Sequence, residues 1–238
     1  MANRRFKDIF DQDPRELPAY GIVEAAHYLQ IPPATVRSWV VGRYYQTRAE
    51  RRFFKPPIFL PDRNRPVLSF MNLVEAHVLD AIRREYGIRL PKVRMALDYL
   101  ASKFPSRHPL ADQRFETDGL DLFIERYGRL ISVSHAGQMA DRTLIEAYLR
   151  RIERDPHGIP IKLYPFTRKR AHDEPKAVVI DPYVSFGRPV LTGTGIATAI
   201  VAERYKAGES VDELRKDYGR DRSEIEEAIR CELQVQAA

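Results

Sequence analysis

The stretch YGIVEAAHYLQIPPATVRSWVVGR, residues 20–43, holds two short helical patterns separated by a pair of prolines. Pro32 and Pro33 disfavour continuation of the first helix, because proline lacks an amide hydrogen and restricts the residue before it. The first pattern has an apolar face formed by Ala25, Ala26 and Leu29. The small alanine side chains allow a second helix to cross closely. We therefore expect a helix-turn-helix, a motif whose second helix can enter the major groove of DNA.

The second helical pattern divides its side chains between the protein interior and solvent. The face that we expect to pack inward carries Val36, Trp39 and Val40. The outward face is then left with Thr35, Arg37 and Ser38. These three outward residues are the predicted DNA contacts of the second helix.

The segment that follows, residues 43–66, is rich in arginine, aromatic residues and proline, which predicts a loop or a β-ribbon. Its basic side chains would supply the phosphate contacts that dominate DNA affinity; they are Arg43, Arg48, Arg51, Arg52 and Lys55. The aromatic residues interleaved with them are Tyr44, Tyr45, Phe53 and Phe54. Such rings could stack on sugars or bases, but we favour packing of a wing onto the protein core.

Within residues 20–43, one run resembles the winged helix-turn-helix of MerR-like and excisionase-like proteins. The residues that carry this resemblance are Glu24, Ala25, Ala26, Leu29, Ile31, Thr35, Val36, Arg37, Trp39 and Gly42. The resemblance implies DNA binding by the second helix and the wing. The alternative is an ordinary helical hairpin without a nucleic-acid contact.

Charge is spread unevenly along the 238 residues, whose formal net charge is +6. Residues 1–66 contain 12 Lys and Arg against 7 Asp and Glu, whereas residues 177–238 contain 8 against 11. The basic N-terminal segment favours a polyanionic partner. The acidic C-terminal segment favours contact with protein over contact with DNA.

The chain is long enough for one large domain or for two to three small ones. We expect an α+β fold, mainly α, in three parts: residues 1–66 with the helix-turn-helix and its basic wing, residues 67–172 as a central helical and β-hairpin region, and residues 173–238 as a small module of short strands and three helices. Helical spacing runs through residues 67–104, and residues 115–134 contain the turn pairs of a β-hairpin. Asp141 is expected to cap a further helix that reaches Ile152.

The composition excludes a membrane protein and favours a reducing compartment. No apolar run approaches the roughly 18 residues of a membrane-spanning helix. The N-terminal residues lack the apolar centre of a signal peptide. Because Cys231 is the single cysteine, no internal disulfide bond can form. We therefore expect a cytosolic protein without a membrane partner.

The residue patterns of metal and catalytic sites are incomplete. Glu24 and His27 have the Glu-x-x-His spacing of di-metal sites in helix bundles, but such sites need a second motif and two further glutamates. Asp118, Asp121 and Glu125 lie close enough in sequence to gather Mg²⁺ for phosphodiester cleavage. A turn with solvent-facing acids accounts for them more simply. We therefore expect no catalytic residue, metal or cofactor, and a Mg-dependent nuclease is the alternative.

Residues 187–210, GRPVLTGTGIATAIVAERYKAGES, are rich in glycine and run into a helical pattern. They lack the lysine of a phosphate-binding loop and the third glycine of a dinucleotide-binding turn. We expect instead a turn between two short strands, followed by a helix that Thr192 or Thr194 caps. Ser210 and Glu213 then form a capping box. The helices predicted here span residues 196–207, 211–218 and 222–233.

The order of motifs in residues 177–233 resembles the small bacterial module known as domain of unknown function 433. The residues that carry this resemblance are Asp181, Pro182, Gly187, Arg188, Pro189, Val190, Thr192, Gly193, Thr194, Ile196, Ala207, Gly208, Glu209, Ser210, Glu213, Leu214 and Tyr218. Two positions depart from the family pattern, because Phe186 stands where a glycine is usual and Gly195 where an arginine is usual.

A helix-turn-helix followed by a central αβ region and this module resembles the VapB-type antitoxins of bacterial toxin–antitoxin pairs. The resemblance implies that the chain binds and neutralises a PIN-like ribonuclease toxin. It also implies binding to double-stranded operator DNA to repress the chain's own operon, as a homodimer or a toxin–antitoxin hetero-oligomer. The alternative is a stand-alone DNA-binding transcriptional regulator of the same architecture.

Overall fold

The computed structural model describes residues 13–46, 50–60, 65–86, 98–99, 106–112, 142–168 and 175–233. The helices are η1 (Pro14–Glu16), α2 (Ile22–Leu29), α3 (Pro33–Val40), α4 (Phe70–Tyr86), α8 (Arg142–Leu149), η3 (Ser185–Gly187), α9 (Thr198–Lys206), α10 (Val211–Tyr218) and α11 (Arg222–Leu233). The strands are β1 (Tyr20–Gly21), β2 (Arg43–Gln46), β3 (Arg51–Phe54), β4 (Val67–Leu68), β5 (Ile152–Arg154), β6 (Pro160–Leu163), β7 (Val178–Val179) and β8 (Val190–Leu191). Helices with short antiparallel strand pairs confirm the predicted α+β, mainly α fold.

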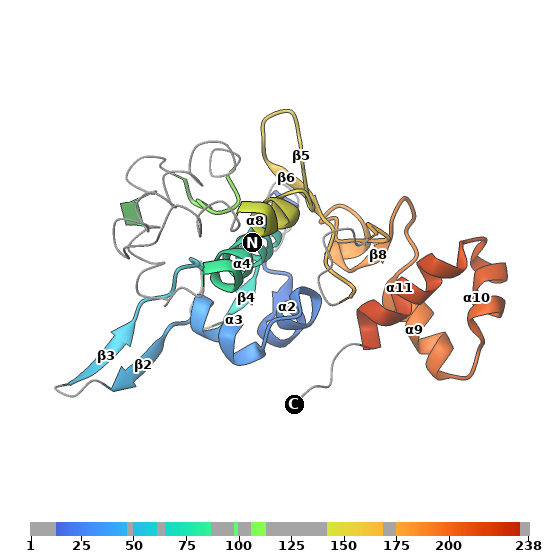
Figure 1. The fold of residues 1–238 in the computed structure, drawn as a ribbon, viewed down its shortest axis with the longest axis horizontal. Helices are drawn as coiled ribbons and strands as arrows, with labels where there is room; N and C mark the ends of the chain where they lie inside the picture. The colour runs from blue at the N-terminus through green and yellow to red at the C-terminus, as the bar shows by residue number, and fades with distance from the viewer. Residues whose placement is uncertain are drawn as a thin grey trace, which may run out of the picture.

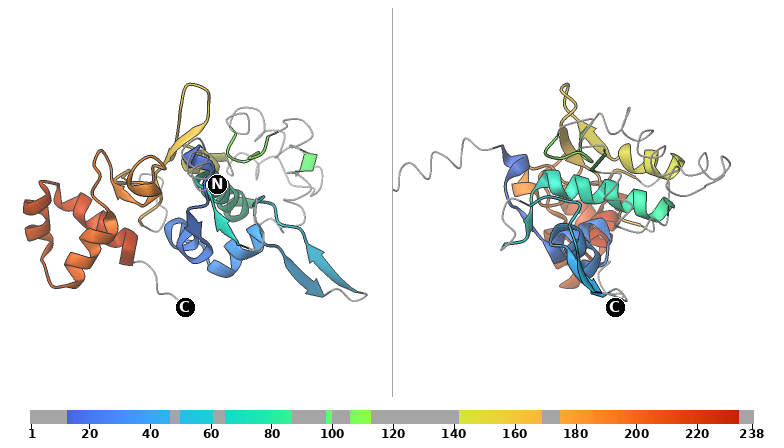
Figure 2. Two further views of the ribbon diagram at one scale, coloured as in Figure 1. Left: turned by 180° about the vertical axis from the view of Figure 1, so that it is seen from behind. Right: turned by 90° about the vertical axis from the view of Figure 1, so that its left-hand side faces the viewer.

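The molecule is elongated, and its two ends carry different elements. The β2–β3 ribbon lies at one end, and helices α9, α10 and α11 lie at the other (Figure 1). Helices α2, α3, α4 and α8 lie between these ends, and the view from behind shows the same arrangement (Figure 2). The ribbon and the C-terminal helices are therefore exposed on opposite sides of a central body.

Helices α2 and α3 form the predicted helix-turn-helix. After α2 ends, Gln30 adopts the left-handed conformation with φ 54° and turns the chain toward the prolines. Helix α3 begins at Pro33. Proline suits this position because the first amide of a helix has no acceptor within the helix, so the missing amide hydrogen costs no hydrogen bond. Strand β1 pairs with β4, so the residues before α2 are joined to the residues before α4.

One hydrophobic cluster joins the helix-turn-helix to the central region. It includes Trp39 of α3, Leu73 of α4 and Tyr148 of α8, all of which are at most 1% exposed. Helix α4 is buried over most of its length, and its buried surface includes Glu75, His77 and Asp80 as well as apolar residues. The helix-turn-helix therefore shares its core with α4 and α8.

His77 and Asp80 are buried polar residues of α4 that have specific partners. The Nε2 atom of His77 lies 3.0 Å from the Tyr148 carbonyl oxygen, and burial lowers the pKa of His77 to about 4. The Tyr148 hydroxyl donates a hydrogen bond to the Asp80 carboxylate at 3.2 Å, and Arg84 forms an ion pair with that carboxylate. Burial raises the pKa of Asp80 to about 6 despite these partners.

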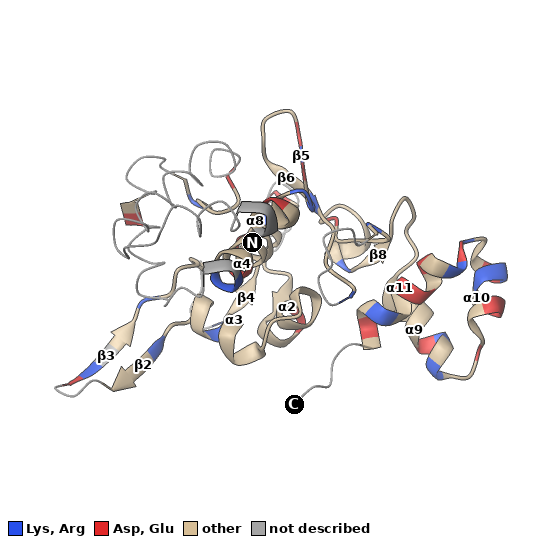
Figure 3. Cartoon of the chain, viewed as in Figure 1, with Lys and Arg blue, Asp and Glu red and all other residues tan. Residues whose placement is uncertain are grey.

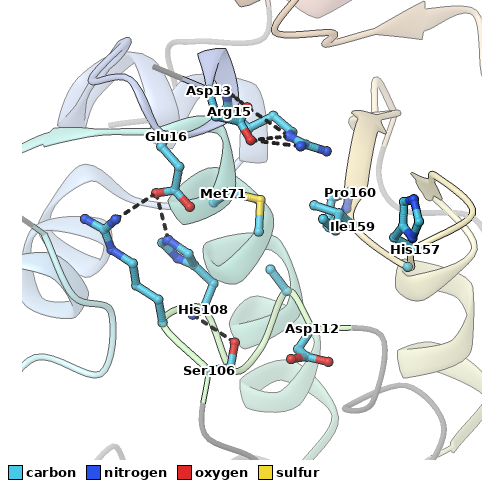
Figure 4. Close-up of a pocket in the computed structure, with 13 residues that line it drawn as sticks. Asp13, Arg15, Glu16, Met71, Ser106, His108, Asp112, His157, Ile159 and Pro160 are labelled. Carbon is cyan, nitrogen blue, oxygen red and sulfur yellow. Dashed lines mark hydrogen bonds and ion pairs between the residues drawn. The ribbon is translucent and has the colours of Figure 1, made fainter. Parts of the chain in front are cut away.

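A second polar cluster fastens the N-terminal residues to α4. The two ring nitrogens of His108 lie 3.0 Å from a Glu75 carboxylate oxygen and 3.1 Å from a Glu16 carboxylate oxygen. Figure 4 shows the contact between His108 and Glu16. Burial alone would lower the pKa of His108, but hydrogen bonds and charge from Glu75 and Glu16 raise it. Each ring nitrogen of His108 faces a carboxyl group, so His108 links Glu16 of η1 to Glu75 of α4. A pocket of about 460 Å³ lies beside this cluster, between η1 and the β5–β6 hairpin.

The C-terminal module has a hydrophobic cluster of its own. Leu191 of β8, Val201 of α9, Leu214 of α10 and Ile225 of α11 are fully buried together. Helices α10 and α11 span the predicted residues, and Ser210 and Glu213 form the predicted capping box. Strands β7 and β8 flank the predicted turn. The local helix and turn signals of this segment are therefore confirmed.

Two predictions about element boundaries are wrong. Helix α9 begins at Thr198, and neither Thr192 nor Thr194 caps it. The Ile196 carbonyl instead accepts a hydrogen bond from the Leu191 amide, which closes a loop before the helix. Ile152 does not end a helix but begins strand β5, which pairs with β6.

Other predictions fall outside the residues that the structure describes. They concern the hairpin at residues 115–134, the helix that follows Pro91, and the capping role of Asp141. Helix α8 does begin directly after Asp141, at Arg142.

Candidate nucleic-acid interface

Helix α3 exposes one of its three predicted contact residues, Arg37. Val36, Trp39 and Val40 are at most 1% exposed, as predicted for the inward face. The Trp39 carbonyl accepts a hydrogen bond from the Ile58 amide at 3.1 Å, which holds the end of α3 against the following chain. Arg37 is exposed and Thr35 is half-buried. The second helix of the motif therefore offers Arg37, with Thr35 beside it, to a partner.

Ser38 does not lie on the outward face, and this part of the prediction is wrong. Its side chain is buried, and its hydroxyl donates a hydrogen bond to the Thr35 carbonyl oxygen at 2.8 Å. A serine hydroxyl is short enough to reach back to its own helix, where it satisfies a backbone acceptor. The Ser38 hydroxyl is therefore occupied by the helix rather than free for a base.

The basic segment forms the β-ribbon that was one of its two predicted structures. Arg43 stands opposite Phe54, Tyr44 opposite Phe53, Tyr45 opposite Arg52, and Gln46 opposite Arg51. Gly42 directly precedes the ribbon and has φ +85°. A Cβ atom there would lie 2.4 Å from the Phe54 carbonyl oxygen, so the close start of the ribbon requires glycine.

The aromatic residues of the ribbon are mostly exposed, which contradicts the expectation that they pack on the core. Tyr44 is 61% exposed, Phe53 is 46% exposed and Tyr45 is 38% exposed, whereas Phe54 is buried. Phe54 stands at the end of the ribbon nearest α3, opposite Arg43. A two-stranded ribbon that projects from the body has only this end in reach of the core (Figure 1).

One face of the ribbon carries a stacked group of aromatic and basic side chains. The rings of Tyr44 and Phe53 pack with their centroids 5.0 Å apart. The guanidinium carbon of Arg51 lies over the Tyr44 ring, 4.3 Å from its centroid. Cross-strand pairing places these three side chains on the same face, since alternate residues of a strand share a face. The face is both apolar and positively charged.

Figure 3 shows Lys or Arg positions on β2, β3 and α3, whereas the C-terminal helices carry positions of both charges. Arg37, Arg43, Arg51 and Lys55 are exposed. Arg52 belongs to β3, and only its backbone position is described. Arg48 lies outside the described residues. The described cations suit a polyanion that crosses α3 and the ribbon.

A groove lies beside Arg37 of α3 and the first turn of α2. Its volume is about 710 Å³. Its lining is formed by Gly21, Ile22, Val23, Glu24, His27, Arg37 and Pro66. Glu24 sits in the first turn of α2, where its carboxylate accepts a hydrogen bond from the Gly21 amide at 3.3 Å.

The C-terminal module is held against this helix-turn-helix by polar contacts that the sequence did not predict. The Tyr20 hydroxyl is buried and donates a hydrogen bond to the Gly187 carbonyl oxygen at 3.0 Å. The Arg188 guanidinium forms an ion pair with the Glu24 carboxylate. His27 lies 3.8 Å from the Glu232 carboxylate, so a protonated His27 forms an ion pair with α11. Residues 187–188 are thus the connection between the glycine-rich turn and α2.

Metal-binding side chains are not clustered in the part of the chain that the structure describes. No group of three or more His, Cys, Asp or Glu side chains there could hold a metal ion. Asp118, Asp121 and Glu125, the residues of the nuclease alternative, lie outside that part. None of the helices in the described residues combines the length and hydropathy needed to span a bilayer.

Two segments match known protein families. Residues 18–97 match a family described as "Putative DNA-binding HTH domain", and residues 178–230 match the "Protein of unknown function (DUF433)" family. These matches confirm the predicted helix-turn-helix and the predicted C-terminal module. The first match extends through α4, in agreement with the core that the helix-turn-helix shares with that helix.

The chain is also similar over most of its length to proteins of Mycobacterium tuberculosis. It is 29% identical over 230 residues to "Putative antitoxin VapB45", with 90% of this chain and 93% of that protein covered. It is 25% identical over 221 residues to "Uncharacterized protein Rv2308", with 88% of each covered. The crystal structure of Rv2018 matches with a TM-score of 0.65 and 25% identity, over 90% of this chain and 98% of that one.

Proposed function

We propose that this chain is the antitoxin of a VapBC-like toxin–antitoxin pair, which binds operator DNA through its helix-turn-helix and ribbon and neutralises a PIN-like ribonuclease toxin. The observation that carries the DNA-binding half is the exposed group of Tyr44, Phe53 and Arg51 beside Arg37 of α3. Aromatic rings and arginines of this kind contact nucleic-acid backbones and bases.

The antitoxin half rests on similarity along the whole chain and on the C-terminal module. The relative named as an antitoxin is matched over nearly its full length, including both recognised domains. At the far end from the ribbon, Tyr205 and Leu233 are 40% and 41% exposed and line a hollow of about 430 Å³. Exposed apolar side chains of this kind support a protein contact there. No catalytic step belongs to this proposal, and the buried thiol of Cys231 suits a reducing cytosol.

DNA binding is tested by fluorescence anisotropy with a labelled duplex taken from directly upstream of the reading frame. The double variant Arg43→Gln, Arg51→Gln should lower the slope of log K against log salt by about 1.8, which is about 0.9 for each lost phosphate contact. Arg215→Gln is the matched control, because Arg215 is an exposed arginine on α10, away from the interface. An unchanged slope in the double variant would show that the ribbon does not contact DNA.

The toxin partner is tested by co-expression with the protein of the neighbouring reading frame. Co-purification, lost in the double variant Tyr205→Asp, Leu233→Asp but kept in Arg215→Gln, is the expected result. If wild type binds DNA but retains no neighbouring protein, the chain is a stand-alone transcriptional regulator, and the antitoxin half of the proposal is wrong.

A further inference from the structure

A carboxylate stands at the edge of the proposed DNA-binding surface. Glu24 lines the same groove as Arg37, and its side chain is 28% exposed. Its Oε2 accepts a hydrogen bond from the Gly21 amide, and its Oε1 accepts one from the Tyr28 hydroxyl at 3.0 Å. These bonds fix the negative charge in the first turn of α2. Helix N-termini next to a recognition helix are places where DNA phosphates approach.

The cation that compensates this charge comes from the other end of the chain. Arg188 forms an ion pair with Glu24 although it belongs to the turn between β7 and β8. Its backbone is fixed on both sides, because its amide donates to the Ser185 carbonyl at 3.0 Å and the preceding Gly187 carbonyl accepts from Tyr20. The buried Tyr20 hydroxyl therefore holds Arg188 at the first turn of α2.

We infer that Arg188 is a positioning residue for DNA binding, which neutralises Glu24 so that the edge of the helix-turn-helix tolerates a phosphate. The inference rests on the proposed DNA-binding function. An uncompensated carboxylate within a Debye length of about 8 Å repels the DNA backbone. The other charged or titratable side chains that line this groove are Arg37, which faces the DNA in this arrangement, and His27, which lies toward Glu232. Arg188 acts through Glu24 rather than through its own contact with DNA.

The experiment compares wild type with Arg188→Gln, Glu24→Gln and the double variant, using the upstream duplex and anisotropy. Arg188→Gln should weaken binding by about threefold to tenfold at low salt, because Glu24 is left uncompensated. Glu24→Gln should strengthen binding by a similar factor, since Gln keeps the capping hydrogen bonds without the charge. The double variant has the same net charge as wild type, and its affinity should lie within about twofold of it.

Three other results would overturn the inference. In the first result, Arg188→Gln weakens binding, the double variant binds no more tightly than Arg188→Gln, and the salt slope falls by about 0.9. Arg188 would then contact a phosphate itself. If Arg188→Gln binds like wild type, Glu24 does not face the DNA. If wild type binds no duplex, the proposed function fails and this inference fails with it. Melting temperatures within about 4 °C of wild type show that each variant is folded, as expected for a partly exposed ion pair.

Discussion

Replacing Gly187 by alanine tests how the C-terminal module is held on the helix-turn-helix. Gly187 has φ +75°, a left-handed conformation that an alanine adopts at a net cost of about 1 kcal/mol. The new Cβ atom would lie 2.3 Å from the Tyr20 hydroxyl oxygen and 3.3 Å from Cζ of that ring. Tyr20 is fully buried, so the ring cannot move aside without disturbing the core.

The alanine therefore adds a second cost. Separation of the two groups breaks the hydrogen bond from Tyr20 to the Gly187 carbonyl and leaves a buried hydroxyl without its acceptor, which costs about 2 kcal/mol. The sum is about 3 kcal/mol, which corresponds to a melting temperature lower by about 6 to 12 °C for a chain of this length. Urea unfolding followed by circular dichroism measures the change in the free energy of unfolding.

Gly193→Ala is the matched control, because Gly193 also has φ +75° but no atom lies within 4 Å of its added Cβ. It should cost only the backbone strain of about 1 kcal/mol. Equal costs at the two glycines would refute the reasoning, since the contact with Tyr20 would then contribute nothing. In a Tyr20→Phe background, which removes the hydroxyl, the excess cost of Gly187→Ala should largely disappear.

Three further changes have expected outcomes. Phe186 is 94% exposed with φ +55°, so Phe186→Gly should raise the free energy of unfolding by about 0.5 kcal/mol; a lower melting temperature would mean that the ring packs against something. Burial lowers the pKa of His77 to about 4, so between pH 6.5 and 4 the unfolded state binds a proton that the folded state does not. The stability of wild type relative to His77→Phe, measured by urea unfolding, should therefore fall by about 3 kcal/mol as the pH falls through that window, and a constant difference would contradict this. Tyr44→Ser with Phe53→Ser should weaken DNA binding several-fold in anisotropy while changing the free energy of unfolding by less than about 0.5 kcal/mol; unchanged affinity would remove the aromatic face from the interface.

The C-terminal turn shows how a family motif can serve the packing of a neighbouring domain. Gly187 and Arg188 belong to the motif that marks the module, yet in this chain they contact Tyr20 and Glu24 of the helix-turn-helix. Glu227 of α11 adds a further polar connection, since it forms an ion pair with Arg168. Apolar packing joins the two parts as well, because Ile180 of the C-terminal module belongs to the same cluster as Tyr20, and Tyr164 packs with Val179 and Val190.

Local signals in the sequence were sufficient to predict helices α2, α3 and α10. Pro32 and Pro33 mark the break between the two helices and begin α3, because the chemistry of proline acts on its immediate neighbours. Helix α2 itself ends at Leu29, where Gln30 adopts the left-handed conformation. The pair Ser210 and Glu213 likewise predicts the start of α10, because a capping box involves two residues that are three positions apart. The exposure of Arg37 followed from helical periodicity.

Exposure and long-range pairing were decided only by the tertiary structure. Helical periodicity places Ser38 on the outer face of α3, but Ser38 is buried. We expect the ribbon aromatics to pack on the core, but Tyr44, Tyr45 and Phe53 are exposed and Phe54 alone of the four is buried. The burial of a side chain depends on which distant segment of the chain packs against it. The projecting ribbon has no segment packed beside its outer residues, so their side chains stay exposed. The sequence likewise determined that Glu24 lies in a helix and Arg188 in a turn. Their ion pair required the fold, because the chain between them must return before two opposite charges can meet.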